Sequence, residues 1–478
     1  MFFRRILAFV ALAGLLLGSL GACTPEANPP QTVAAGNPAA VPRPSPLPRA
    51  IERETGPVYN SPQLQALVDR IGNRLVSQSN LPGTYRFYIL DQPLPNAHAV
   101  SGGYVFVTRG LLAMVDDDAE LAAAMSHELG HLTQRHAAQR EQARKGVIDA
   151  AVQAAMTSGS IQVGRSVASN GMLELRRYSR EQELEADRVG LSYLVKAGYR
   201  GDAMAGLIDK LRRQSRLEDE LLGVEERGGQ TSSASTHPAP NDRLSALQTI
   251  PAARQPGEAD RAGYLALIDG MSVDDAPEEG FVRGSTFLHP TMRLAFEAPS
   301  DFRLLNDHDG VFGFGRDRSA MNFSCSPDKV AGRLDDWMRN KLKPTPTDIE
   351  ATTIGGMEAA IGARPRGADT GLAQVRYVLI RFGDGVCYFN LASDGPDRDR
   401  RIDMLLNAAR SFRALTAAEA AALKPYRLHI VPRGSGSAAQ YAQRLPYGDH
   451  RMARLLALNG VDNAAEFTQR SEIKLVEP

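Results

Sequence analysis

The chain has 478 residues with 55 Lys and Arg against 55 Asp and Glu, so its formal net charge at pH 7 is zero. A balanced charge excludes the strongly basic character by which many proteins attract nucleic acid. The length allows about three domains on the usual domain size. We therefore expect several folded units rather than one small module.

The first 22 residues have the pattern of a lipoprotein signal peptide. Two arginines precede an apolar run at residues 6–17, and residues 20–23, Leu-Gly-Ala-Cys, have the form of a lipobox. A permanent membrane helix is the alternative, although the run is short for one. Cleavage before Cys23 would make this residue the acylated N-terminus, and Thr24 after it favours the outer membrane of a diderm cell. We expect a lipid-anchored envelope protein that faces the periplasm.

Residues 23–57 are predicted to form a tether. They are rich in Pro and Ala, and four prolines stand in a near-alternating row between Pro42 and Pro48. Such a composition is typical of a semi-extended segment without a core of its own.

The pentad His-Glu-Leu-Gly-His at residues 127–131 lies in a segment with strong helix signals. Asp117, followed three residues later by Glu120, has the pattern of a capping box, and an Ala-rich apolar run follows. The sequence thus predicts a helix that begins near Asp117 and continues through the pentad.

On that helix the two histidines of the pentad share a face. His127 and His131 are one turn apart and can bind one metal ion, and Glu128 can reach a water molecule at that metal. The alternative is an ordinary pair of surface histidines. His136, five residues further on, is expected to point elsewhere and fits that alternative.

A catalytic zinc site needs a third protein ligand and an open fourth position. Residues 179–182 form a second capping-box pattern, which predicts a helix from there to the Lys-Ala-Gly stop at residues 196–198. Glu183 and Asp187 are four apart and share a face of this helix. The economical assignment makes Glu183 the third ligand and Asp187 the acceptor that orients a zinc-bound histidine. Glu185 is interpreted as a first-turn acid that favours the helix dipole.

Three segments together resemble the gluzincin metallopeptidases of family 48, which include the HtpX-type proteases and the CAAX prenyl endopeptidases. The segments are the pentad, SREQELEADRVG at residues 179–190 and PNAHAVSGGYVFVTRGLL at residues 95–112. The resemblance covers residues 58–250. It implies one zinc ion per chain, with the Glu and Asp of the ExxxD element at Glu183 and Asp187.

The same resemblance implies a mostly helical protease domain with a small sheet. Its edge strand, Tyr104 to Thr108, is expected to pair with an extended substrate by strand addition. HtpX-type relatives carry membrane helices, and this chain departs from them, because outside the leader no stretch approaches the roughly 18 apolar residues of a spanning helix. Residues 146–172, rich in Ala and Val, are interpreted either as a helical cover over the active-site cleft or as ordinary packing helices.

Thr236-His237-Pro238 and Arg243 resemble the HPxxxxR stretch that follows the second helix in this family. His237 either donates to the oxyanion of the tetrahedral intermediate, or binds the zinc and closes its fourth position, or is a loop residue without a role. Arg243 either clamps a carboxylate or a substrate carbonyl, or is structural. The Gly- and Ser-rich run at residues 228–235 would let this loop move.

An α/β accessory domain without a catalytic constellation is expected at residues 281–415. Cys325 and Cys387 fall in two of its predicted strands and either form a disulfide or remain buried thiols. The predicted strands include Leu294 to Glu297, Val311 to Phe314, Val375 to Phe382 and Val386 to Leu391, and the predicted helices are Leu334 to Leu342 and Ile402 to Phe412.

Residues 425–478 weakly resemble a LysM module, with a strand, two helices and a closing strand. The Gly-Asp-Thr turn expected after the first strand is replaced by Pro432 to Gly436, so a glycan-binding module and a docking module are both possible. The predicted elements are Arg427 to Val431, Ala438 to Arg444, Arg451 to Leu458 and Ile473 to Val476.

The sequence therefore predicts an α+β fold: a signal peptide at 1–22, a tether at 23–57, a zinc metallopeptidase domain at 58–265, and the two modules above. The predicted function is a zinc-dependent endopeptidase that cleaves misfolded or unassembled cell-envelope proteins. The alternative is an envelope assembly factor or chaperone-like lipoprotein whose latent zinc site is closed by His237. Expected partners are polypeptide substrates, the membrane through the lipid anchor, and peptidoglycan or an envelope protein, but no nucleic acid.

Overall fold

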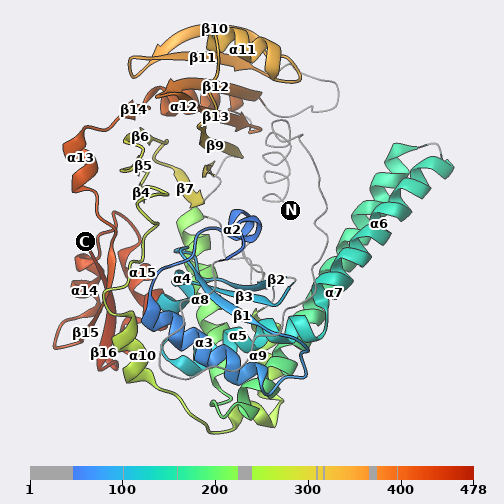
Figure 1. Ribbon diagram of the computed structural model, residues 1–478, viewed down its shortest axis with the longest axis vertical. Helices are drawn as coiled ribbons and strands as arrows, with labels where there is room; N and C mark the ends of the chain where they lie inside the picture. Colours follow the sequence, from blue (N-terminus) through green and yellow to red (C-terminus); the bar gives the residue numbers. More distant parts are fainter. Residues whose placement is uncertain are drawn as a thin grey trace.

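The computed structural model describes residues 47–100, 102–158, 160–223, 240–307, 310–315, 318–364, 374–395 and 397–478. The fold is α+β, as predicted: a mainly helical body holds a small sheet, and a sheet-rich body stands on it (Figure 1). The predicted signal peptide, Cys23 and His237 lie outside the described residues.

The small sheet has three strands, β1 (Arg86–Leu90), β2 (Ala97–Val100) and β3 (Tyr104–Thr108), in the order β1-β3-β2. The strand expected at Tyr104–Thr108 is present, but the prediction that it lies at the edge is wrong. It pairs with β1 in parallel and with β2 antiparallel, because the turn at Gly102 and Gly103, both at positive φ, folds β2 back beside it. The two edge strands of the sheet are therefore β1 and β2.

Helices of the lower body pack around this sheet, and helix α5 (Asp118–Thr133) is the most enclosed of them. All residues from Ala119 to His131 are buried, which explains why the sequence of α5 lacks a polar face. The other helices of this body are α3 (Pro62–Val76), α4 (Arg109–Met114), α8 (Ala203–Leu222), α9 (Pro240–Gln248), a short 3-10 turn (Pro251–Arg254) and α10 (Arg261–Ile268).

Helices α6 (His136–Ser158) and α7 (Ile161–Lys196) form a long antiparallel hairpin. The second helix ends at Lys196 as predicted, but its predicted start at residues 179–182 is wrong, since α7 begins at Ile161 and passes through that capping-box pattern without a break. Residues 146–158 and 161–172 are helical, and the outer half of the hairpin points away from the body rather than over it (Figure 1). The interpretation as a cover over the cleft is therefore not supported.

The end of the predicted tether is folded. Residues Arg49–Thr55 form helix α2, and Leu47 is buried in a small cluster with Tyr88, Leu90 and Phe106. The prediction of an extended segment without a core is wrong for this stretch, because Leu47 reaches the outer face of the small sheet.

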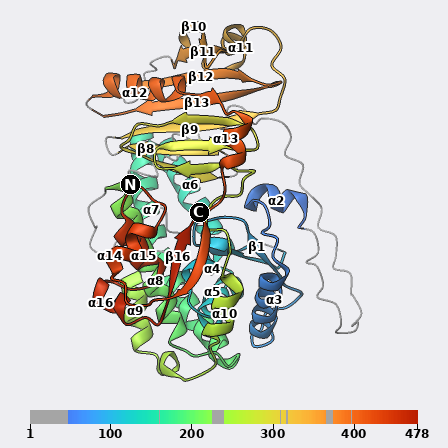
Figure 2. The same cartoon turned by 90° about the vertical axis from the view of Figure 1, so that its left-hand side faces the viewer.

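The upper body is built on a seven-stranded antiparallel sheet in the order β10-β11-β12-β13-β9-β8-β7 (Figure 2). A four-stranded sheet, β14-β6-β5-β4, lies beside it (Figure 1). Helix α12 (Arg398–Arg410) packs into the main hydrophobic core of the upper body, against β12 and β13. Helix α11 (Leu334–Lys341) belongs to a second, smaller hydrophobic cluster and packs against β11 and β12. The elements are β4 (Phe281–Arg283), β5 (Thr286–His289), β6 (Leu294–Glu297), β7 (Phe302–Asp307), β8 (Gly310–Gly315), β9 (Ser319–Ser326), α11 (Leu334–Lys341), β10 (Thr347–Ile354), β11 (Met357–Ala363), β12 (Gln374–Phe382), β13 (Gly385–Ser393), α12 (Arg398–Arg410), β14 (Arg413–Ala414) and α13 (Ala417–Ala422).

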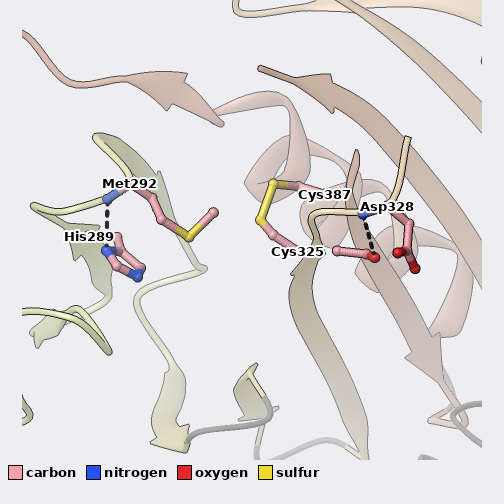
Figure 3. The surroundings of a disulfide bond; sticks show 6 residues. His289, Met292, Cys325, Asp328 and Cys387 are labelled. Carbon is pink, nitrogen blue, oxygen red and sulfur yellow. Dashed lines mark hydrogen bonds between the residues drawn. A yellow bond between two sulfur atoms is a disulfide. The ribbon is translucent and has the colours of Figure 1, made fainter. Parts of the chain in front are cut away.

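Cys325 on β9 and Cys387 on β13 are direct partners across the sheet and form a disulfide, the first of the two predicted alternatives (Figure 3). The bond joins two neighbouring strands in the middle of the large sheet.

The C-terminal module has the predicted order of elements: β15 (Arg427–Pro432), α14 (Ala438–Arg444), α15 (Arg451–Leu458), a short α16 (Ala464–Thr468) and β16 (Glu472–Glu477). Asn459 after α15 is buried and bonds Leu455 O, Lys474 O and Lys474 N, so it supports the module itself. The module packs on the helical body, where Asp462 accepts hydrogen bonds from Arg213 and Arg216 of α8. The docking interpretation and the likeness to LysM both stay predictions.

Among the described residues, none of the helices combines the length and the apolar character that a membrane crossing requires.

Candidate metal centre

Helix α5 starts where the sequence predicts. The side chain of Asp117 accepts a hydrogen bond from Glu120 N at 2.9 Å and caps the helix. The reciprocal bond of the capping box is shifted by one residue, because the Glu120 carboxylate accepts from Asp116 N at 2.7 Å and also pairs with Lys210 of α8. This start fixes the register that turns the pentad toward α7.

Two glycines allow α5 and α7 to cross closely. A Cβ atom on Gly130 would lie 2.7 Å from Ala186 O, and one on Gly190 would lie 2.8 Å from Ser126 O and 3.0 Å from the Cα of His127. These contacts are with backbone atoms, so a side chain at either position would push the helices apart. The close crossing brings Glu183 of α7 opposite the histidines of α5.

Three buried residues bring possible metal-ligand atoms close together: His127, His131 and Glu183. The Nε2 atoms of the two histidines are 3.0 Å apart, and the Glu183 carboxylate lies 3.3 Å from His127 Nε2 and 3.5 Å from His131 Nε2. Ligands at zinc–donor distances of about 2.1 Å in a tetrahedron are about 3.4 Å apart. The two-nitrogen, one-oxygen donor set and its spacing therefore fit one zinc ion.

The second ring nitrogen of His127 faces Asp187. His127 Nδ1 lies 2.9 Å from Asp187 Oδ1, which leaves Nε2 for a metal. Burial and the charge of Arg243 lower the pKa of His127, yet its hydrogen bonds to Asp187 and Glu183 raise that pKa to about 9. The contact with Asp187 thus holds the imidazole at a fixed orientation.

Arg243 is buried beside the metal-binding residues and forms two hydrogen bonds with Asp187. Its Nε and Nη2 donate to the two carboxylate oxygens of Asp187, both at 2.7 Å, and its Nη1 is 3.5 Å from Glu183 Oε2. Burial raises the pKa of Asp187, but Arg243 and His127 hold it well below the usual range. The carboxylate that Arg243 clamps therefore belongs to the chain itself, and these contacts support a positioning role for Arg243 rather than direct contact with substrate.

His136 contacts His131, so the prediction that it points elsewhere on the surface is wrong. It is fully buried, and its Nδ1 lies 2.8 Å from His131 Nδ1 because the turn at Arg135, which has a positive φ, places the first residue of α6 beside the pentad. With Nε2 of His131 turned to the metal position, its Nδ1 carries the proton and donates to His136 Nδ1. His136 then carries its proton on Nε2, which is 3.3 Å from Glu185 Oε2.

The interpretation of Glu185 as a first-turn acid is therefore wrong, because it lies well inside α7. Its carboxylate pairs with His136, which in turn contacts His131. Glu128 follows His127 on α5, is 5% exposed, and is close enough for its charge to raise the pKa of Arg243 together with Asp187 and Glu183. His237 lies outside the described residues, so its three alternatives stay open.

Comparison with known proteins identifies the segment that holds this centre. Residues 62–251 match Peptidase family M48. This segment is therefore similar to the M48 peptidases. It contains every described residue of the metal centre.

Relatives of the chain carry the names of β-barrel assembly-enhancing proteases and of a mitochondrial metalloendopeptidase. A "Putative beta-barrel assembly-enhancing protease" of Vibrio cholerae is 34% identical over 268 residues, which are 51% of this chain and 52% of the relative. The "Beta-barrel assembly-enhancing protease" of Escherichia coli is 29% identical over 40% of each chain. The "Mitochondrial metalloendopeptidase OMA1" of Schizosaccharomyces pombe is 28% identical over 38% of this chain and 51% of the relative. The chain thus spans about half, or less, of the length of these curated relatives.

Proposed function

We propose that the protein is a zinc-dependent endopeptidase of the cell envelope. The observation that carries the proposal is the buried meeting of His127, His131 and Glu183 at zinc-ligand spacing inside the segment that is similar to the M48 peptidases, with Glu128 beside them. In this proposal the three residues are the metal ligands and each chain holds one zinc ion.

The residues around the proposed zinc site have separate roles in the reaction. A bound zinc ion supplies Lewis acidity, which acidifies water and polarises a peptide carbonyl. Glu128 accepts a proton from the attacking water and returns it to the leaving amine. Asp187 and Arg243 hold the tautomer and the orientation of His127, which keeps its Nε2 aimed at the metal position.

An extended polypeptide is the proposed substrate. Strand β2 lies at the end of the small sheet and packs against α5, so a peptide that adds to β2 as a further strand would run beside the metal centre. This replaces β3, the strand expected from the sequence, as the docking edge. The names of the bacterial relatives support substrates among envelope proteins, in keeping with the leader and lipobox predicted at residues 1–23.

Glu128→Gln tests the proposal. The variant is expected to keep one zinc ion per chain, measured by elemental analysis, while its cleavage of an unfolded envelope protein falls by at least about a hundredfold, because the proton acceptor is lost. Glu141→Gln, at an exposed glutamate of α6, is the matched control and is expected to retain activity.

Glu183→Gln completes the test, since it is expected to lower the zinc content itself. Full cleavage by Glu128→Gln, or a normal zinc content in Glu183→Gln, would contradict the assignment of these roles.

A further inference from the structure

The hairpin of α6 and α7 carries most of the large apolar side chains that the described part of the chain exposes. Eight such side chains are exposed, and five of them lie between Ile148 and Met172. Ile148, Val152 and Met156 recur every four residues, so they line one face of α6, which we call the apolar stripe. Met156 is 78% exposed. Such a concentration of exposed apolar groups marks an interaction surface.

The apolar stripe is not needed for packing within the hairpin. The two helices meet through small residues: a Cβ atom on Gly164 would lie 2.7 Å from Ala151 O, and one on Gly171 would lie 2.6 Å from Val147 Cγ1. Val147 and Ala151 therefore belong to the inner face of α6, and the apolar stripe lies outside it.

The tip of the hairpin and its stem differ in charge. Residues 150–164, at the tip, contain no charged residue. Residues 135–180, which are the hairpin without the end of α7 at the metal centre, contain eight Lys and Arg against three Asp and Glu, a net charge of +5 in a chain whose net charge is zero. Arg144 and Lys145 are exposed just below the apolar stripe. The hairpin thus has a charge-free apolar tip on a basic stem.

We propose that the α6–α7 hairpin docks on an anionic phospholipid surface. The apolar stripe and Val163 would enter the interfacial region, and the basic stem would face the headgroups. The tip is convex and projects from the body (Figure 1), which suits a soft continuous surface better than the concave or strand-edge sites that bind peptides. Neither helix is apolar enough over its length to cross a bilayer, so the contact is with the lipid surface.

Docking would set the distance between the lipid surface and the metal centre. His136, which contacts His131, and Met156 are separated by 20 residues of α6, and the helix rise makes this about 30 Å. The centre would then be held within about 30 Å of the lipid surface, at the height of polypeptides that emerge from it.

Vesicle flotation tests the proposal with the protein purified without residues 1–23, so that neither the apolar leader nor an acyl group on Cys23 contributes. The protein is expected to float with vesicles that contain phosphatidylglycerol, to bind pure phosphatidylcholine vesicles less, and to detach as salt rises. Val152→Asp and Met156→Asp are each expected to weaken binding by about tenfold, since burial of one such side chain is lost.

Met452→Asp, at an exposed methionine of α15 outside the hairpin, is the control and is expected to bind like the parent protein; Met452 is 36% exposed, against 78% for Met156. Equal binding of Met156→Asp and Met452→Asp would overturn the proposal. So would a concentration-dependent dimer that Met156→Asp abolishes without any vesicle binding, because the stripe would then face a second copy. Running the series in the Glu128→Gln background separates the result from the proposed peptidase activity.

Discussion

Each histidine of the metal centre has a different partner for its second ring nitrogen. His127 faces the buried Asp187, which is held by Arg243, whereas His131 faces the neutral ring of His136 and, through it, Glu185. A carboxylate increases the basicity of its histidine more than a neutral acceptor does, so the two ligands are held by unequal partners. The acceptor at Nδ1 of His136 is what fixes the tautomer of His131.

Two substitutions of His136 should therefore distinguish the effect of its hydrogen-bond acceptor from the effect of its side-chain volume. His136→Leu is expected to weaken zinc binding by about 10-fold to 100-fold, because His131 loses the acceptor for its Nδ1 proton. His136→Asn places an amide oxygen near the position of Nδ1 and is expected to restore much of the affinity. Competition with a chelator measures both, and equal affinities for the two variants would contradict the positioning role.

At the scale of elements, the crossing of α5 and α7 decides the ligand geometry. Gly190→Ala is expected to cost about 1–3 kcal/mol of unfolding free energy, because its Cβ meets backbone atoms of Ser126 and His127, and to lower zinc affinity by moving Glu183 away. Gly146→Ala is the control: a Cβ there meets nothing within 4 Å, so the change is expected to stabilise α6 slightly. Urea unfolding and chelator competition measure the two effects, and unchanged zinc affinity in Gly190→Ala would count against the crossing as the determinant.

Local signals were enough for much of the fold. The Asp117 cap predicts the start of α5, and alternation with turn residues predicts the hairpin of β12 and β13. The start of α7 could not be predicted locally, because Gln182 of the capping-box pattern instead donates to Gln139 of α6 and the upstream residues pack along that helix. The contact of His136 with His131 and the central place of β3 also depend on how distant segments fold back. The sequence signal for the close crossing of α5 and α7 is the pair of glycines, Gly130 in the pentad and Gly190 at the end of the SREQELEADRVG segment.

At the scale of the whole molecule, Asp116 joins the metal helix to the C-terminal module. This residue precedes α5 and accepts from four cations: Lys210 of α8, Arg261 of α10, and Arg470 and Lys474 of the module, all at 3.0–3.1 Å. Lys474 also donates to the carbonyls of residues 113–115 at the end of α4. The module is therefore fastened at the start of the helix that carries the pentad.

Removal of the Asp116 charge should destabilise the protein in a pH-dependent way. Burial raises the pKa of Asp116, but Lys474, Lys210, Arg261 and Arg470 lower it far below the ordinary value. A carboxyl group with a lower pKa in the folded state binds fewer protons there than in the unfolded chain. Its stabilising contribution is therefore complete above about pH 4 and is lost as the pH falls below that value.

Asp116→Asn is accordingly expected to lower the free energy of unfolding by about 3–5 kcal/mol at neutral pH, because it leaves buried cations without their carboxylate. The difference in unfolding free energy between variant and parent should narrow as the pH falls below about 4, because the unfolded parent then binds a proton that its folded state, with the lower pKa, does not bind. Urea unfolding across this pH range measures the gap. Glu477→Gln, which removes a half-exposed pair with Arg444 in the same module, is the control and is expected to cost less than about 1 kcal/mol. A gap for Asp116→Asn that stayed constant down to acid pH would show that the carboxylate charge is not what fastens the module to α5.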